Sequence, residues 1–247
     1  MAQYALDRVL SVAGTDAVKG NVIFLADQIV DPSLSFTSET EDIVDAMNNV
    51  VMVLENGRGA TFSASNAFFN TQILAAQVGG EVTTGATEIT KYDIVTLGEG
   101  GKAKLSATAK GTEAKIYALA KDGSLTTAEA VDGTISAGEV TVADGVKDAK
   151  VLVVYTAEVT AEEKISAFAD AKNKLMNVTA EVLLKELCNE ELYYAYIIMR
   201  GKLSGEAEWS MTRDGNHAFE ITAMPAYCDA ERKLVEVIIV KGEDLVA

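Results

Sequence analysis

The clearest alternation of apolar and polar residues lies at 206–224 and predicts a β-hairpin. A two-residue Asp214–Gly215 loop would mix its two faces, because a one-residue slip turns every side chain to the other side. A three-residue loop at 213–215, with Gly215 in the left-handed region, keeps the faces separate and is the predicted turn. The apolar face then consists of Ala207, Trp209, Met211, Phe219, Ile221 and Ala223.

The second face of this hairpin is acidic and carries Glu206, Glu208 and Glu220. Like charges at opposite positions destabilise a strand pair, so this face calls for a functional explanation. The apolar face is expected to anchor the hairpin to the core through Trp209, Phe219 and Ile221. The predicted register sets opposite residues as Trp209–Phe219, Ala207–Ile221 and Glu208–Glu220.

Further apolar runs predict strands at both ends of the chain. Residues 22–26 are typical of a buried strand, and Asp31–Pro32 marks a turn before alternation resumes at 34–36. The expected strands of the last third are Val178–Cys188, Tyr193–Leu203 and Leu234–Val240. These segments predict a mainly β protein.

The acidic segment 39–49 follows neither the helical nor the strand period. After it, residues 50–54 and 60–64 predict two strands joined through Asn56–Gly57. Residues 39–49 are therefore expected to form a long excursion from the sheet.

One helix is expected to cover a face of this sheet. Ser65 or Asn66 can cap it, Phe69 and Ile73 recur at helical spacing, and Gly79–Gly80 can end it. Phe69 and Ile73 are predicted core residues.

The composition changes at 83–159, which is rich in alanine, threonine, glycine and lysine and has frequent turn signals such as Asp132–Gly133 and Ala137–Gly138. This predicts a small, sandwich-like β insertion between 1–82 and 160–247, which together form one discontinuous domain. A capping box at 160–163 predicts a short helix towards Ala171, with a strand at 164–168 as the alternative.

The charge balance argues against nucleic-acid binding. Lys and Arg number 21 against 37 Asp and Glu, a formal net charge of −16, whereas proteins that grip DNA need a basic surface. Two cysteines without CxxC spacing predict neither a disulfide framework nor a zinc site. The first residues lack a secretory pattern, and the apolar runs are too short to span a membrane.

No constellation predicts catalysis or a cofactor. His217 is the single histidine, and it lies near the hairpin tip, where water cannot be excluded from a nucleophile. Sugar-cleaving sites stack substrates on aromatic rings, which make up only 6% of the chain. The run Gly98–Lys102 departs from the phosphate-loop spacing. We expect no enzyme, no bound metal and no cofactor.

The runs Gly20–Phe36, Asn66–Gly79 and Trp209–Phe219, and the order of the elements around them, resemble the tail tube (major tail) proteins of tailed bacteriophages. The resemblance covers about 21–81 and 150–240. It implies a β-sandwich or β-barrel of tail-tube type with a flanking α-helix. The insertion would lie on the outside of the assembly.

The resemblance further implies hexameric rings that stack into a hollow tube, through which double-stranded DNA passes without specific binding. Other tail proteins, namely sheath or terminator and tape measure, would be partners, and the protein would be made in the bacterial cytoplasm and reside in the virion tail. Glu206, Glu208 and Glu220 would then line the lumen, since an acidic wall repels phosphate. The predicted inter-subunit loop contains Glu39, Glu41, Asp42, Asp45, Asn48, Asn49 and Glu55.

Two other classes remain open at this point. A capsid decoration or accessory virion protein would also be acidic and rich in β-strands. Alternatively, the insertion could belong to a carbohydrate-binding adhesion module, which exposed aromatic platforms would favour.

Overall fold

The computed structural model describes residues 3–143, 147–188, 191–206, 212, 215–225 and 231–242, with the side chain of Asn56 excepted. The chain divides into two compact units. One consists of Met1–Val82 with Ile165–Ala247, and the other of Thr83–Lys164. The second junction thus lies at 164–165, beyond the predicted boundary at 159–160.

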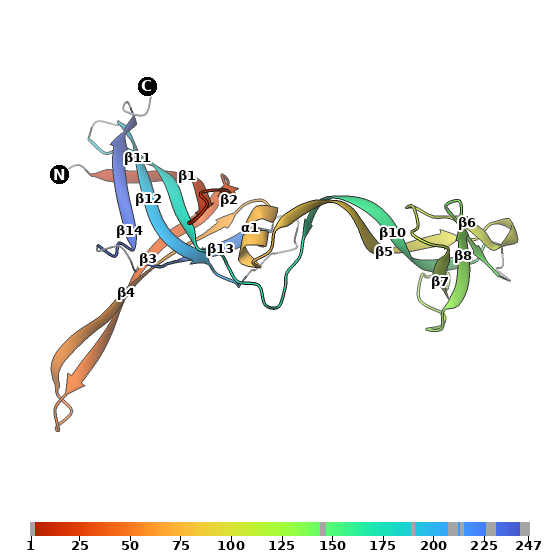
Figure 1. The fold of residues 1–247 in the computed structure, drawn as a ribbon, viewed down its shortest axis with the longest axis horizontal. Coiled ribbons are helices and arrows are strands. Elements are labelled where there is room, and N and C mark those ends of the chain that lie inside the picture. Colours follow the sequence, from red (N-terminus) through yellow and green to blue (C-terminus); the bar gives the residue numbers. More distant parts are fainter. Residues whose placement is uncertain are drawn as a thin grey trace. The chain divides into compact units, whose positions relative to one another are not determined.

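The first unit is built on an eight-stranded sheet in the order β2-β1-β11-β12-β13-β4-β3, with β14 also paired to β12. The sheet curls around a core, with one helix against it (Figure 1). The predicted mainly β, barrel-like class with a flanking helix is confirmed. The strands are β1 (Tyr4–Asp16), β2 (Val22–Ala26), β3 (Ile29–Val44), β4 (Val50–Asn66), β11 (Met176–Glu186), β12 (Leu192–Leu203), β13 (His217–Ala223) and β14 (Val235–Lys241).

Alternating side chains place the core on one face of this sheet. Along β13, residues 217, 219, 221 and 223 are buried and the residues between them are exposed. The ring of Phe219 packs edge-on against Phe24 at a centroid distance of 6.0 Å, and Phe62 lies 6.4 Å from it. Among the predicted anchors, Phe219 and Ile221 are buried, whereas Trp209 lies outside the described residues.

The predicted hairpin register is wrong. Ile221 is opposite Leu203 of β12 on one side and Phe62 of β4 on the other, so both of its edges are occupied; its predicted partner, Ala207, lies outside the described residues. The alternation of β13 identified the strand and its buried face. One neighbour, β12, precedes it in the chain, and the other, β4, comes from a distant part of the chain, so local turn chemistry does not encode the pairing.

Strand β1 was not predicted. Its register against β11 shifts between Leu6 and Arg8 and again between Val9 and Ser11. Each bulge inserts an unpaired residue, which reverses the inward and outward alternation beyond it. The sequence therefore lacks a continuous period of two over this strand.

The helix, α1 (Thr71–Gln77), starts later than predicted. Ser65 and Asn66 belong to β4, and the cap is Asn70, whose Oδ1 accepts hydrogen bonds from the backbone N–H groups of Gln72 and Ile73. At the other end Gly79 has a φ of 66° and the Gly80 N–H donates to the Ala75 carbonyl, so the helix ends as predicted. The predicted core residue Ile73 is fully buried.

The second unit is one six-stranded sheet in the order β5-β10-β7-β8-β9-β6. Strand β10 continues through 160–165, so the predicted helix there is wrong, because pairing with β5 overrides the capping signal. Asp132–Gly133 lies inside β8, while Ala137–Gly138 forms a turn as predicted, with φ values of 53° and 81°. The elements are β5 (Val82–Thr96), η1 (Glu99–Gly101), β6 (Lys102–Lys104), β7 (Glu113–Ala118), β8 (Val131–Ser136), β9 (Glu139–Val142) and β10 (Lys150–Ile165).

Across the described residues, no helix is both long and apolar enough to cross a membrane.

Candidate assembly surfaces

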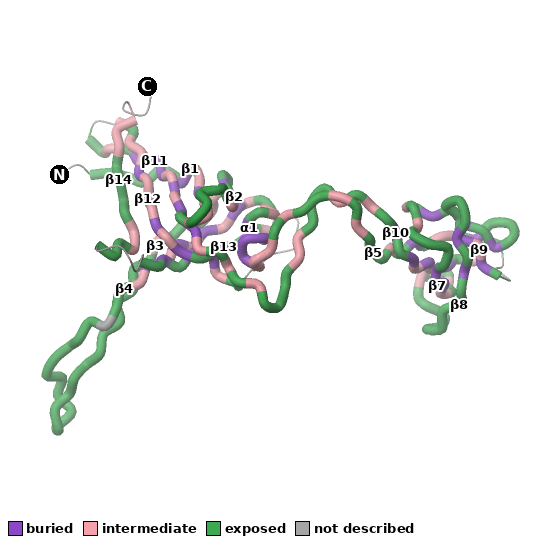
Figure 2. The backbone as a smooth tube through the Cα atoms, in the orientation of Figure 1, coloured by how far each residue is buried: buried purple, intermediate pink, exposed green. Residues whose placement is uncertain are grey.

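Strands β3 and β4 extend beyond their neighbours as a long hairpin, the arm (residues 36–59), which is exposed over most of its length (Figures 1 and 2). Residues 39–49 do leave the sheet as predicted, but as one strand and the turn of a regular hairpin and not as an irregular segment, and the predicted turn at Asn56–Gly57 is wrong. Residues 39–44 belong to β3 and 56–57 to β4, and the Asp31–Pro32 turn is a bulge inside β3. Alternation failed here because both faces of the arm are open to solvent, so neither face had to be uniformly apolar.

The turn of the arm is organised by Asp45. Its carboxylate accepts hydrogen bonds from the backbone N–H groups of Met47 (2.8 Å) and Asn49 (2.9 Å) and from the Asn49 side-chain amide (3.2 Å). These bonds, chiefly that from the Asn49 backbone, lower the pKa of Asp45. Asn48 supplies the left-handed residue, with a φ of 64°. The tip is therefore ordered before any partner binds.

The tip of the arm carries apolar side chains that nothing in the described structure covers. Ile43 lies opposite Met52 and Glu41 opposite Leu54 on one face, while Asp42 lies opposite Val53 on the other. The exposed fractions are 43% for Ile43, 55% for Met52, 54% for Val53 and 38% for Leu54. Contiguous exposed apolar residues rimmed by polar groups are typical of interaction sites.

The residues predicted for an inter-subunit loop all lie on this arm and are exposed. Glu39, Glu41, Asp42 and Glu55 are on its strands, and Asp45, Asn48 and Asn49 form its turn. The apolar residues of this contact surface were not predicted, because 50–54 has the composition of a buried strand.

The outward face of β13, β4 and β3 is polar. Glu220 lies opposite Ser63, and the hydroxyl oxygens of Ser63 and Ser33 are 3.0 Å apart. A hollow of about 610 Å³ on this face is lined by Asp31, Glu206 and Glu220 together with serines and other residues, and none of the described residues that line it is a lysine or an arginine. Two predicted lumen residues, Glu206 and Glu220, thus share a surface with Asp31, which the sequence analysis missed. The third, Glu208, lies outside the described residues.

Two edge strands of the sheet, β2 and β14, differ. At β2, the side-chain amide of Asn70 donates to the Leu25 carbonyl at 2.9 Å, so the start of α1 covers part of that edge. Strand β14 pairs, within the described part of the chain, with β12 alone. Its Val237, Ile238 and Ile239 are exposed by 54%, 42% and 45%. An unpaired apolar edge strand is a template for pairing with another chain.

A buried polar pair fixes β13 to α1. His217 is fully buried, not exposed at a hairpin tip as its sequence position suggested. The Gln77 amide nitrogen donates to the Ala218 carbonyl at 2.9 Å, which leaves Gln77 Oε1 to accept from His217 Nε2 at 2.8 Å. Phe69 stacks on the imidazole at 5.7 Å and is itself 40% exposed. Phe69, predicted as a core residue, therefore lies at the rim of the core and covers this pair, so that prediction is wrong.

This pair predicts a loss of stability in mild acid. Burial lowers the pKa of His217 below its ordinary value of 6.5. The unfolded chain then binds a proton on His217 more tightly than the folded chain does. The stabilisation that comes from neutral, buried His217 is therefore complete above about pH 6.5 and declines below it. We expect the free energy of unfolding in urea to be lower at about pH 5.5 than at about pH 7.5. The variant His217→Gln should lose this dependence, and an unchanged pH profile in the variant would contradict the assignment.

These features define a class of protein: an all-β chain built on a curled sheet, with a projecting arm and an open strand edge. The chain belongs to the YomU/Tube protein family, whose model matches residues 5–231. The family name indicates a phage tube protein, which confirms the resemblance seen in the sequence and implies a place in the virion tail among other tail components. No curated protein matches the chain.

Proposed function

We propose that copies of this chain close into rings, expected to be hexameric, and that the rings stack into the tube through which the phage genome is ejected. The observation that carries this proposal is the arm. A preformed hairpin with exposed apolar side chains on both faces of its tip is suited to a neighbouring subunit or an adjacent ring. The open edge of β14 supports lateral contacts between subunits in the same way.

The polar outward face of β13, β4 and β3 is our candidate for the wall of the lumen. The described residues that line its hollow are carboxylates, hydroxyls and uncharged groups and offer phosphate no cation, so DNA would pass without the release of counterions that drives binding. The formal net charge of −16 supports the same role. DNA is thus a passenger in this proposal and not a ligand.

The remaining parts of the proposal concern partners and chemistry. The expected partners are other tail proteins. A tape measure protein would occupy the lumen, and sheath or terminator proteins would bind the outside or the end of the tube. We assign the chain no catalytic activity and no cofactor. Its function would reside in surfaces and not in a reactive site.

Electron microscopy of the purified chain tests the proposal. We expect rings or tubes of uniform diameter in negative stain, appearing as the concentration is raised, because assembly follows mass action. A protein that stays strictly monomeric at high concentration would contradict self-assembly. Analytical ultracentrifugation of the same samples distinguishes ordered rings from heterogeneous aggregates.

A further inference from the structure

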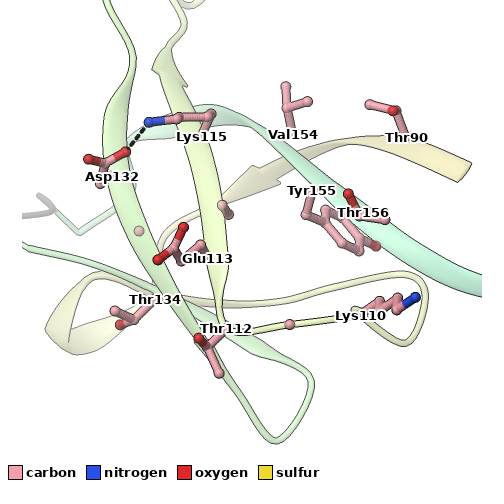
Figure 3. A pocket seen from close by; sticks show the side chains of 13 residues that line it. Thr90, Lys110, Thr112, Glu113, Lys115, Asp132, Thr134, Val154, Tyr155 and Thr156 are labelled. Carbon is pink, nitrogen blue, oxygen red and sulfur yellow. Dashed lines mark hydrogen bonds and ion pairs between the residues drawn. The ribbon is translucent and has the colours of Figure 1, made fainter. Parts of the chain in front are cut away.

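The unit Thr83–Lys164 contains a cavity that the proposed tube function does not use (Figure 3). Its volume is about 720 Å³, within the roughly 300–1,000 Å³ typical of small-molecule sites. All of its lining residues belong to this unit and come from β5, β7, β8, β10 and the segment before β7.

The cavity opens where the ladder between β7 and β10 is interrupted. The regular register ends with Lys115 opposite Val154, and the next backbone bond runs from the Lys110 N–H to the Thr156 carbonyl at 2.8 Å. Residues 111–114 lie between these two points, and Gly111 turns the chain there with a φ of 110°. Such interruptions cost ladder hydrogen bonds and occur preferentially next to functional sites.

Tyr155 forms a rigid floor at this interruption. It is 3% exposed, and its hydroxyl donates to Asp93 Oδ2 at 2.9 Å while accepting from the Ala107 N–H at 3.1 Å. Asp93 also accepts hydrogen bonds from the Ser106 N–H and hydroxyl, both at 2.7 Å. Because each of these groups is held by others, the ring cannot leave its place without breaking the network. The cavity is therefore preformed, which limits the entropy lost on binding.

The walls combine hydroxyl groups with balanced charges. Lys115 forms an ion pair with Asp132, and the cavity is also lined by Glu113 and Lys110, so the lining carries as many cations as carboxylates. This balance favours neither phosphate nor a metal cation. Four threonines contribute hydroxyls that both donate and accept: Thr90, Thr112, Thr134 and Thr156.

We propose that this cavity binds a neutral saccharide. Vicinal sugar hydroxyls present donors and acceptors side by side, and the threonine hydroxyls, the Glu113 carboxylate and the lysines offer complementary groups within one concave surface. Val154, half-buried on β10, supplies the apolar contact among the lining residues, above the buried Tyr155. The insertion would thereby add a sugar-binding surface to the protein, independent of whether it forms tubes.

Nuclear magnetic resonance of the full ¹⁵N-labelled chain tests this proposal. The probes are neutral trisaccharides of glucose and of N-acetylglucosamine, with a trimer of galacturonic acid as the anionic comparison. We expect the amide signals of Gly111, Thr112 and Gly133 to shift with a neutral trisaccharide at millimolar concentration. Thr156→Val keeps strand propensity and removes one hydroxyl, and Glu113→Gln removes one charge.

Each of these variants should weaken binding about tenfold, the value of one hydrogen bond to a charged or aligned partner. The matched controls Thr126→Val and Glu139→Gln are exposed residues of the same unit outside the cavity and should bind as the unaltered chain does. Shifts with the anionic trimer alone would overturn the proposal. So would an absence of shifts with every probe, or equal binding by the variants and the controls.

Discussion

Replacing both Met52 and Leu54 with glutamate is expected to abolish tube formation while leaving the subunit folded. The two side chains are exposed by 55% and 38% in the isolated chain, so they add little to its own stability. In an assembled contact each buried apolar side chain contributes roughly 1.5–3 kcal/mol, and the new carboxylates would also have to be desolvated. The concentration needed for assembly should rise at least about a hundredfold, measured by sedimentation and electron microscopy.

A matched control lies in the other unit, where Leu125 is 55% exposed. Leu125→Glu combined with Val131→Glu, at a residue 54% exposed, adds the same two charges at comparably exposed apolar residues and should leave assembly unchanged. Thermal unfolding of every variant below the assembly concentration shows whether the fold is intact, and serine at 52 and 54 serves as a milder replacement. Normal tubes from the glutamate variant would rule out the arm tip as a contact.

Replacing Glu206 and Glu220 with lysine is expected to leave tubes intact and to impair DNA delivery. Both residues are exposed on the polar outward face and line the same hollow, so the exchange should not disturb the core. Lysines repeated in every subunit of a stacked tube would bind phosphate along its whole length. We expect genome delivery by assembled particles to fall at least about tenfold, with partial recovery at higher salt, because salt weakens such contacts.

Glutamine at the same two positions distinguishes attraction from the loss of repulsion, since it removes the charge without reversing it. That variant should deliver DNA better than the lysine variant. Glu129→Lys combined with Glu139→Lys, at two exposed positions in the other unit, makes the same change in net charge and controls for it alone. Full delivery by particles with lysine at 206 and 220 would remove these residues from the lumen.

The parts of the fold that sequence reasoning found are those where burial imposes a strict pattern. Strand β13 has a core on one side and solvent on the other, so its alternation is unbroken. Strand β1 pairs with β11 from Tyr4 to Asp16, but its two bulges shift the alternation and conceal it. The start of α1 was misplaced because Asn66 is as good a cap as Asn70 in the sequence. Only the continuation of β4 decides between them.

The candidate surfaces were predictable in charge but not in shape. The acidic residues of the arm and the carboxylates Glu206 and Glu220 could be named from the sequence. That Asp31 joins the latter two depends on the pairing of the β3–β4 hairpin with β13, which is distant from it in sequence. Likewise, the apolar composition of 50–54 fits a buried core strand and an exposed contact surface equally well. The sequence therefore predicted a core strand where the structure has an exposed surface.

The bulge within the arm has a further consequence for how its length can vary. Glu39 is opposite Gly57 but Thr40 is opposite Glu55, so β4 contains one residue more than β3 at this point. Between the bulge and the tip, Leu54 and Met52 lie on the same face of the arm as Thr61 and Ser63, which are nearer the sheet. Without the extra residue, Glu55 and Val53 would lie on that face instead of Leu54 and Met52. A single-residue insertion or deletion in β4 between the bulge and the tip would exchange the two surfaces that this strand presents. Related arms should therefore differ in length by even numbers of residues in each strand if they keep the same surface towards their neighbours.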